Sequence, residues 1–177
     1  MPKLFGFFAL FGFFANITLH ADTLTEYQVK ALFLFNFAKY VSWPTNAFSQ
    51  TNTPVTIGVL GKNNFGGGLE TTVEGKSING RQIIIRFIEK ESDWNKCQVL
   101  FISSSENPRL AEILGKIKAM PVLTVGESKQ FIQQGGIINF IKKEGKVRLE
   151  INLGAAELAG LQISSKLLNV ADSVCGK

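Results

Sequence analysis

The chain has 177 residues, with 19 lysines and arginines against 14 acidic residues and a formal net charge of +5. The basic residues are scattered along the chain rather than clustered with aromatic residues, which argues against a nucleic-acid-binding patch. The single histidine, His20, falls inside a predicted export signal, so the mature chain would have no histidine for a Ser-His-Asp or Cys-His catalytic site. An ordinary zinc site needs several cysteine or histidine ligands, and the mature chain would have only two cysteines.

The first 21 residues have the pattern of a secretory signal. Lys3 precedes an apolar run from Leu4 to Phe14, and small or polar residues then lead to Ala21. The apolar run is shorter than the roughly 20 residues that a membrane-spanning helix needs. The pattern therefore predicts an exported protein whose signal, residues 1–21, is cleaved near Ala21. The remainder, residues 22–177, has the size of one domain.

A long helix is predicted near the start of the mature chain. Thr23 or Thr25 can cap its first turn, and the helix should end at about Val41, before Pro44. One apolar face follows helical spacing and consists of Tyr27, Ala31, Leu34, Phe35, Ala38 and Val41. A second apolar stripe consists of Val29, Phe33, Phe37 and Tyr40.

Two apolar stripes on one helix must be buried against two different surfaces, because the core of one domain normally buries only one stripe. The second cover could be the C-terminal helical region of the same domain. It could equally be a second subunit or another protein, since exposed apolar patches of this size usually mark such contacts. The stripe is therefore a candidate interface.

The rest of the chain alternates between strands and helices. Strands are predicted at 54–60, 82–88, 99–102, 121–125, 137–141 and 147–153, and further helices at 69–73, 108–119, 128–134 and 155–171. Asn79-Gly80 is a tight-turn signal, and a turn over 142–146 makes the last two strands antiparallel. This order predicts a single α/β domain with a mixed sheet of about six strands, flanked by about five helices.

Three segments are candidates for chemistry. The Gly61–Gly68 loop follows a strand, as a phosphate-binding loop would, but glycines stand where its lysine and Ser/Thr should be. Ser103–Ser105 also follow a strand, but without a histidine base a polar turn is the better interpretation. Glu150 beside Arg148 is better interpreted as half of a surface ion pair than as a catalytic acid. We therefore predict no catalytic residue, no cofactor and no metal, and a protein that acts by binding.

The two cysteines leave two alternatives open. An exported protein meets an oxidising compartment, so Cys97 and Cys175 could form a disulfide. They could equally be two separate thiols, because spacing alone does not determine connectivity.

The mature chain resembles the YfiR family in order along nearly its whole length, which is more specific than any one motif. The segments that carry the resemblance are Glu26–Ala31, Phe35–Val41 with Trp43-Pro44, Val59–Gly61 with Phe65-Gly66, Gly75-Lys76 with Asn79–Arg81, Cys97 with Val99–Ser103, Pro121–Val125, Gly135–Ile138, Arg148–Leu153 and Gly160–Leu168.

The resemblance implies a periplasmic protein, often a homodimer, that represses an inner-membrane diguanylate cyclase by acting on its periplasmic region. It also implies an OmpA-like outer-membrane lipoprotein that sequesters the repressor, and through cyclic di-GMP a control of biofilm formation. Relatives often have a cysteine about where Gly58 stands, bonded to the cysteine matching Cys97. That partner is absent here, so redox control through this bridge is not expected.

Two functional hypotheses follow. The leading one is a periplasmic regulatory protein that binds a membrane diguanylate cyclase and is not an enzyme. The alternative is a periplasmic small-ligand sensor with a site at the strand ends near Gly61–Gly68, where ligands bind in open α/β sheets.

Overall fold

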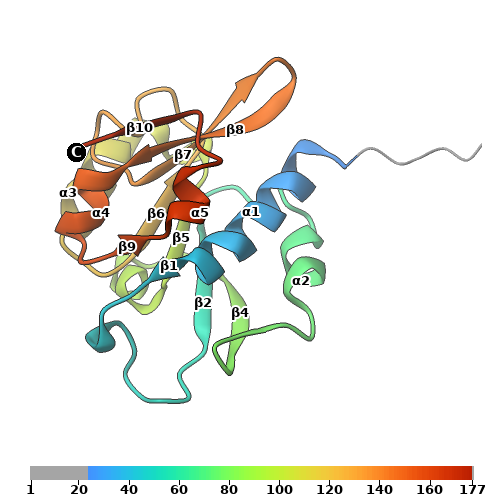
Figure 1. The fold of residues 1–177 in the computed structure, drawn as a ribbon, viewed down its shortest axis with the longest axis vertical. Helices are drawn as coiled ribbons and strands as arrows, with labels where there is room; N and C mark the ends of the chain where they lie inside the picture. Colours follow the sequence, from blue (N-terminus) through green and yellow to red (C-terminus); the bar gives the residue numbers. More distant parts are fainter. Residues whose placement is uncertain (1–23, 177) are drawn as a thin grey trace, which may run out of the picture.

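The computed structural model describes residues 24–176, and the predicted export signal lies outside this range. An eight-stranded mixed sheet forms its centre (Figure 1). Its strands are β2 (Val55–Leu60), β3 (Ser77–Ile78), β4 (Arg81–Ile88), β5 (Val99–Ile102), β6 (Leu123–Gly126), β7 (Ile138–Lys143), β8 (Lys146–Asn152) and β10 (Ser173–Cys175). The order across the sheet is β10-β8-β7-β6-β5-β2-β4-β3. A separate antiparallel pair joins β1 (Val41–Ser42) to β9 (Gln162–Ile163).

Within the described range, five α-helices and three short 3-10 helices surround the sheet. The α-helices are α1 (Glu26–Tyr40), α2 (Gly68–Val73), α3 (Leu110–Ile117), α4 (Leu153–Leu158) and α5 (Ser165–Leu168). The 3-10 helices are η1 (Thr45–Ala47), η2 (Glu91–Lys96) and η3 (Ser104–Arg109). None of the helices in residues 24–176 combines the length and the apolar character that crossing a bilayer requires.

The centre of the sheet is parallel and buried on both faces. β4, β2, β5, β6 and β7 run in the same direction, and β8 returns antiparallel to β7. Every residue of β2, β5 and β6 is buried, as expected for the continuous apolar runs of parallel strands. From β2 the chain moves outward to β4 and then crosses back to β5, so the winding of the sheet reverses between β2 and β5.

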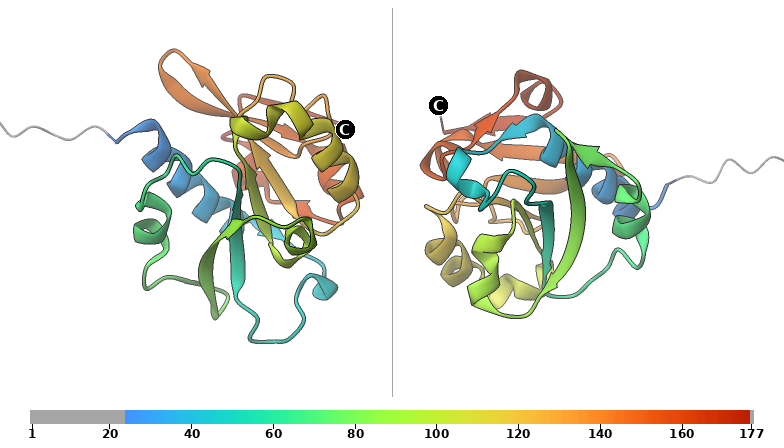
Figure 2. Two further views of the ribbon diagram at one scale, coloured as in Figure 1. Left: turned by 180° about the vertical axis from the view of Figure 1, so that it is seen from behind. Right: turned by 90° about the horizontal axis from the view of Figure 1, so that it is seen from below.

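Two apolar clusters hold helices on the two faces of the sheet. On one face, α1, α2 and α5 pack against side chains such as Ile57, Val99 and Phe140. On the other face, η2 and α3 pack around Trp94 and Leu100. The front and rear views show α1 and α3 on opposite sides of the sheet (Figures 1 and 2). The α/β fold class with one mixed sheet is therefore confirmed, although the sheet has eight strands rather than about six.

Local sequence signals account for several elements. Thr25 and Gln28 form a reciprocal capping box at the start of α1. Asn79 and Gly80 have φ values of 51° and 77° and close a two-residue hairpin between β3 and β4. This combination of positive φ angles is the reason that Asn-Gly predicts such a turn.

The predicted helix at 128–134 is wrong, because this segment forms irregular turns. The ring of Phe131 is fully buried and fills the space where side chains would begin on Gly126 and Gly136. The backbone N–H of Gly136 donates back to the Phe131 carbonyl at 2.9 Å. Docking of one aromatic ring between two glycines thus overrides local helix preference.

The predicted C-terminal helix at 155–171 is also only partly correct. Its residues divide into α4, β9 and α5, and a further edge strand, β10, follows. Gly160 ends the first helix with a φ of 70°, which a glycine adopts without steric cost. Four strands were not predicted: β3 and β10 extend the main sheet to eight strands, and β1 and β9 form the separate pair.

Candidate functional site

The second apolar stripe predicted on α1 is largely part of the core. Phe37 is fully buried, and its ring stacks on Phe140 of β7 with centroids 5.8 Å apart. Phe33 is half-buried and contacts both rings. The half-buried Tyr40 packs against the same cluster, which also contains Leu167 of α5. The prediction that Phe37 belongs to an interface is therefore wrong, because β7 and α5 of the same domain contribute to the core cluster that buries it.

Another side of α1 is apolar and open. Leu24 and Leu32 are 57% and 40% exposed, and Gln28 lies between them at helical spacing. A groove separates this side from α2, and we call it the α1–α2 groove. It is lined by Leu24, Thr25, Gln28, Leu32, Phe65, Gly67, Gly68, Thr71 and Thr72. Of the predicted stripe, Val29 is half-buried on the helix beside this surface.

Sequence reasoning missed Leu32 because α1 carries apolar residues on nearly every side. A helical pattern distinguishes a buried face only where polar residues alternate with apolar ones. The residues that mark the buried side include a lysine, Lys30, at 4% exposure, whereas Leu32, two residues further along the helix, faces solvent.

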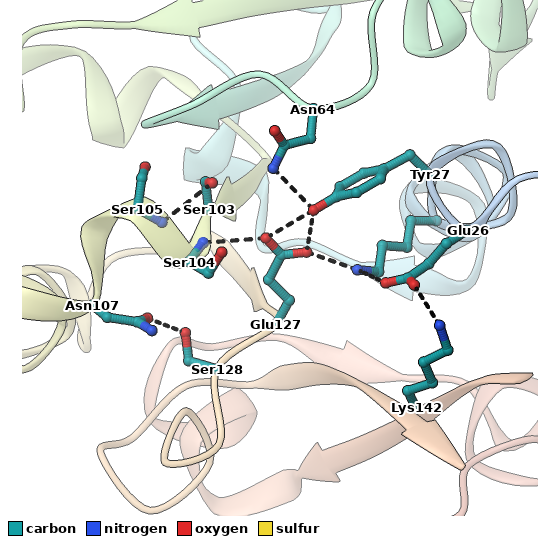
Figure 3. A network of polar contacts seen from close by, with 11 residues as sticks. Glu26, Tyr27, Asn64, Ser103, Ser104, Ser105, Asn107, Glu127, Ser128 and Lys142 are labelled. Atoms are coloured by element: carbon teal, nitrogen blue, oxygen red, sulfur yellow. Dashed lines mark hydrogen bonds and ion pairs between the residues drawn. The ribbon is translucent and has the colours of Figure 1, made fainter. Parts of the chain in front are cut away.

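Beneath the first turns of α1 lies a buried polar cluster (Figure 3). The ammonium group of Lys30 donates to Glu127 Oε2 at 2.7 Å and to Glu26 Oε1 at 2.7 Å. The Tyr27 hydroxyl donates to the Glu127 carboxylate at 3.1 Å and accepts from Asn64 at 3.0 Å. Glu127 therefore links α1 directly to the end of the sheet.

The cluster forms where parallel strands end. Asn64 follows β2, Ser104 follows β5 and Glu127 comes directly after β6. The Ser104 backbone N–H donates to Glu127 Oε1 at 3.2 Å. The carboxyl ends of strands beside a reversal of winding are where open α/β sheets bind ligands, but here Tyr27 and Lys30 of α1 lie across this edge.

The charges of the cluster are mutually satisfied. Burial alone would lower the pKa of Lys30, but its hydrogen bonds to Glu127 and Glu26 outweigh this effect and raise the pKa above its usual value. Burial, followed by the neighbouring Glu127 carboxylate, raises the pKa of the Tyr27 hydroxyl. Lys142 pairs with Glu26 at 3.3 Å, so two cations face two carboxylates. Such a cluster is suited to fixing α1 on the sheet.

The segments considered for chemistry have structural roles. Gly61 has a φ of 88°, and a Cβ there would lie 2.5 Å from Ser105 Oγ. The strand-end loops named from the sequence therefore pack on each other.

Glu150 accepts a hydrogen bond from Asn139 at 3.2 Å, and across residues 24–176 it forms no ion pair with Arg148. In the same range, no three His, Cys, Asp or Glu side chains gather as a metal site would require.

Both cysteines are free thiols, Cys97 buried and Cys175 exposed. Cys97 directly precedes Gln98 and β5, whereas Cys175 lies on β10, with β6, β7 and β8 between the two strands. Neighbouring strands are about 4.8 Å apart, and a disulfide needs Cα atoms within about 7 Å. An intramolecular Cys97–Cys175 bond is incompatible with this sheet order.

The fold and these residues can be compared with known proteins. The sequence profile described as YfiR/HmsC-like matches residues 27–172. The chain belongs to the YfiR/HmsC-like family. This family is periplasmic and regulatory, and the match covers every described helix and the whole polar cluster except Glu26.

Other comparisons are more distant. A conserved domain protein from Vibrio cholerae is 16% identical with a TM-score of 0.49, over 68% of this chain and 54% of that one. An ABC domain from Streptococcus pneumonia, solved with L-Trp, is 11% identical with a TM-score of 0.54, over 82% of this chain and 60% of that one. The YfiR/HmsC-like chain thus spans little more than half the length of these proteins, and the second likeness extends to the fold alone. No curated protein matches the sequence.

Proposed function

We propose that this YfiR/HmsC-like protein binds the periplasmic region of an inner-membrane diguanylate cyclase and represses it, which lowers cyclic di-GMP and biofilm formation. Family membership supports a regulatory role in the periplasm. We assign the α1–α2 groove as the surface that binds the cyclase because two exposed leucines, Leu24 and Leu32, line it.

The α1–α2 groove has the properties of a protein-binding surface. Apolar side chains that remain exposed gain free energy when a partner removes them from water, at about 25 cal/mol per Å². The groove also offers polar side chains, with Thr25, Gln28 and Thr71 among its lining residues. Protein interfaces likewise combine apolar contacts with about one hydrogen bond per 100–200 Å² of buried area.

The buried polar cluster makes this surface rigid. Lys30 and Glu127 fix the inner side of α1 at the sheet edge, so the outer leucines are held in place before a partner arrives. A preformed surface loses less conformational entropy on binding. Repression follows if the surface binds the inactive conformation of the cyclase more tightly than the active one.

The same surface provides a route to relief of repression. We propose that an OmpA-like outer-membrane lipoprotein sequesters this regulator, in competition with the cyclase for the α1–α2 groove. Both partners would then need Leu24 and Leu32, and neither could bind while the other occupies them.

The proposal is tested by measuring cyclic di-GMP in the source bacterium. Deletion of the gene should raise cyclic di-GMP, and the wild-type gene should restore the lower level. A Leu24→Asp, Leu32→Asp double variant should fail to restore it. Leu158→Asp is the matched control, because Leu158 is 59% exposed on α4, and this variant should restore repression fully.

A photo-crosslinking residue at position 32 identifies the protein bound. Recovery of a membrane diguanylate cyclase crosslinked through its periplasmic region supports the proposal. Unchanged cyclic di-GMP after deletion of the gene contradicts the function. Full repression by the double variant, with equal periplasmic protein levels, contradicts the role of the groove.

A further inference from the structure

A cavity opens at the carboxyl ends of two neighbouring parallel strands, β5 and β6. The end of η3 and the start of α3, which follow β5, form one side, and the loop after β6 forms the other. Its volume is about 430 Å³, within the range of roughly 300–1,000 Å³ that is usual for small-molecule sites. This edge is where open α/β sheets bind ligands, and the side chains of α1 that lie across the edge are not part of the cavity lining.

Buried polar groups contribute to the cavity wall. Ser128 is 7% exposed and the side chain of Glu127 is 6% exposed, and both line the cavity. The Ser128 hydroxyl donates to the amide oxygen of Asn107, and this pair lies on the side of Glu127 away from Tyr27 (Figure 3). Asn107 also lines the cavity, and its amide nitrogen has no partner among residues 24–176.

The amide of Gln134 is only partly satisfied. Its Nε2 donates to Gln130 Oε1 at 3.2 Å. Its Oε1 is buried and, within the described part of the chain, accepts no hydrogen bond. Buried amide oxygens are rarely left unpaired, because the loss of hydration is then uncompensated. Both glutamines line the cavity, so a ligand with hydroxyl groups would bring the kind of donor that Gln134 lacks.

The charges around the cavity favour a neutral ligand. The Glu127 carboxylate already pairs with the ammonium group of Lys30. It also accepts hydrogen bonds from the Tyr27 hydroxyl and the Ser104 backbone N–H. An anionic ligand would be repelled by this carboxylate, and a cationic one would compete with Lys30. Lys129 also lines the cavity but is exposed to solvent, which screens its charge.

The remaining lining groups select the kind of neutral molecule. The side chains of Asn107, Ser128, Gln130 and Gln134 can each donate and accept hydrogen bonds, and the hydroxyl groups of a sugar also do both. Leu110 is the one apolar side chain in the lining, and no aromatic ring from residues 24–176 lines the cavity. We propose that this cavity is a binding site for a small neutral saccharide.

This inference does not rest on the proposed cyclase partner, and the cavity is separate from the α1–α2 groove. It is tested by NMR titration of the exported protein with glucose, N-acetylglucosamine and maltose, followed through the backbone amides. At least one sugar should bind and shift the amides of Asn107 and of residues 127–134. Glucuronate and glucosamine, which carry a charge on the same ring, should bind at least about tenfold more weakly.

Two variants and a matched control locate the site. Gln130→Met and Gln134→Met nearly keep the side-chain size and remove the amide. Each should weaken binding about fivefold, as expected for one lost hydrogen bond. Gln130 is exposed, so its variant keeps the fold. Gln133→Met is the control, because Gln133 is exposed in the same loop and does not line the cavity, and it should bind as wild type does.

Three results would overturn the proposal. The first is that none of the three neutral sugars binds at millimolar concentration. The second is that a charged sugar binds as tightly as its neutral counterpart. The third is binding that shifts only amides away from the cavity, or that is equally strong in wild type and in both the Gln130→Met and Gln134→Met variants.

Discussion

The ammonium nitrogen of Lys30 lies 2.7 Å from Oε2 of Glu127, and each of the two side chains is only 6% exposed. The pair joins the first helix of the domain to the end of β6, across 97 positions of sequence. Both charges have lost most of their hydration, so each depends on the other. Because α1 carries the proposed partner surface on its outer side, this pair connects stability with function.

Replacing Lys30 with Met should destabilise the fold by about 3–5 kcal/mol, because the buried Glu127 carboxylate would lose its cation. Urea unfolding followed by far-UV circular dichroism measures the loss. The double variant Lys30→Met, Glu127→Gln removes both charges and should be more stable than the single variant. Lys39→Met, at an exposed position of the same helix, should change stability by less than about 0.5 kcal/mol. Equal effects at positions 30 and 39 would contradict a dominant role for the pair.

The protein should lose stability in alkali above about pH 10. Burial lowers the pKa of Lys30, but its hydrogen bonds to Glu127 and Glu26 outweigh this effect and raise the pKa. Burial raises the pKa of Tyr27. Both groups therefore hold their protons more tightly in the folded state than in the unfolded state. Their contributions are complete below the ordinary pKa values and decline as the pH rises through the folded ones. Urea midpoints should fall less steeply in Tyr27→Phe than in wild type over this range, and parallel slopes would contradict the prediction.

The two thiols should differ strongly in reactivity. Burial raises the pKa of Cys97 to about 12, so only about one molecule in ten thousand carries the reactive thiolate at pH 8. Cys175 is exposed. Ellman's reagent should therefore label one thiol in the native protein and two in denaturant, and Cys175→Ser should abolish the native reaction. Rapid labelling of two thiols in the native state would show that Cys97 is accessible.

Gly58 and Cys97 are close enough for a disulfide to be introduced between them. A Cβ on Gly58 would lie 2.6 Å from the Cys97 sulfur, so Gly58→Cys needs only a small shift to reach bonding geometry. The bridge closes a loop of roughly 40 residues and should stabilise the oxidised protein by about 4 kcal/mol before any strain is subtracted. The oxidised and reduced forms are compared by urea unfolding with and without reductant.

Gly58→Ser is the matched control, because serine has nearly the same size and cannot form the bridge. Its Cβ would also lie 3.0 Å from Ile88 and 3.1 Å from Leu100. We expect a loss of about 1–3 kcal/mol from this crowding, with or without reductant. An oxidised Gly58→Cys protein that is no more stable than Gly58→Ser would contradict the prediction.

Several elements could be predicted from the sequence because their causes are local. The capping pair Thr25 and Gln28 defines the start of α1, and Asn79-Gly80 defines a hairpin. The strand predicted at 99–102 agrees with β5 residue by residue, because a buried parallel strand is a continuous apolar run. The family could also be identified, since its motifs follow one another along the whole domain.

The candidate site was only partly predictable. Asn64 and Ser104 belong to loops that were singled out for following strands, whereas Glu127 carried no local signal. On α1, the prediction paired Phe37 with an interface, and the structure places Phe37 against Phe140, 103 positions further along the chain. The edge strand β10 was not predicted, because its pairing with β8 has no local sequence signal.

By itself, the sequence determined the first helix, the six central strands, the α/β class and the family, because capping residues, turn residues and apolar periodicity act over a few neighbouring positions. Only the tertiary structure decided which side of α1 is buried and that Lys30 pairs with Glu127. These outcomes depend on contacts between residues far apart in the chain, where the free energy of burial outweighs local preference.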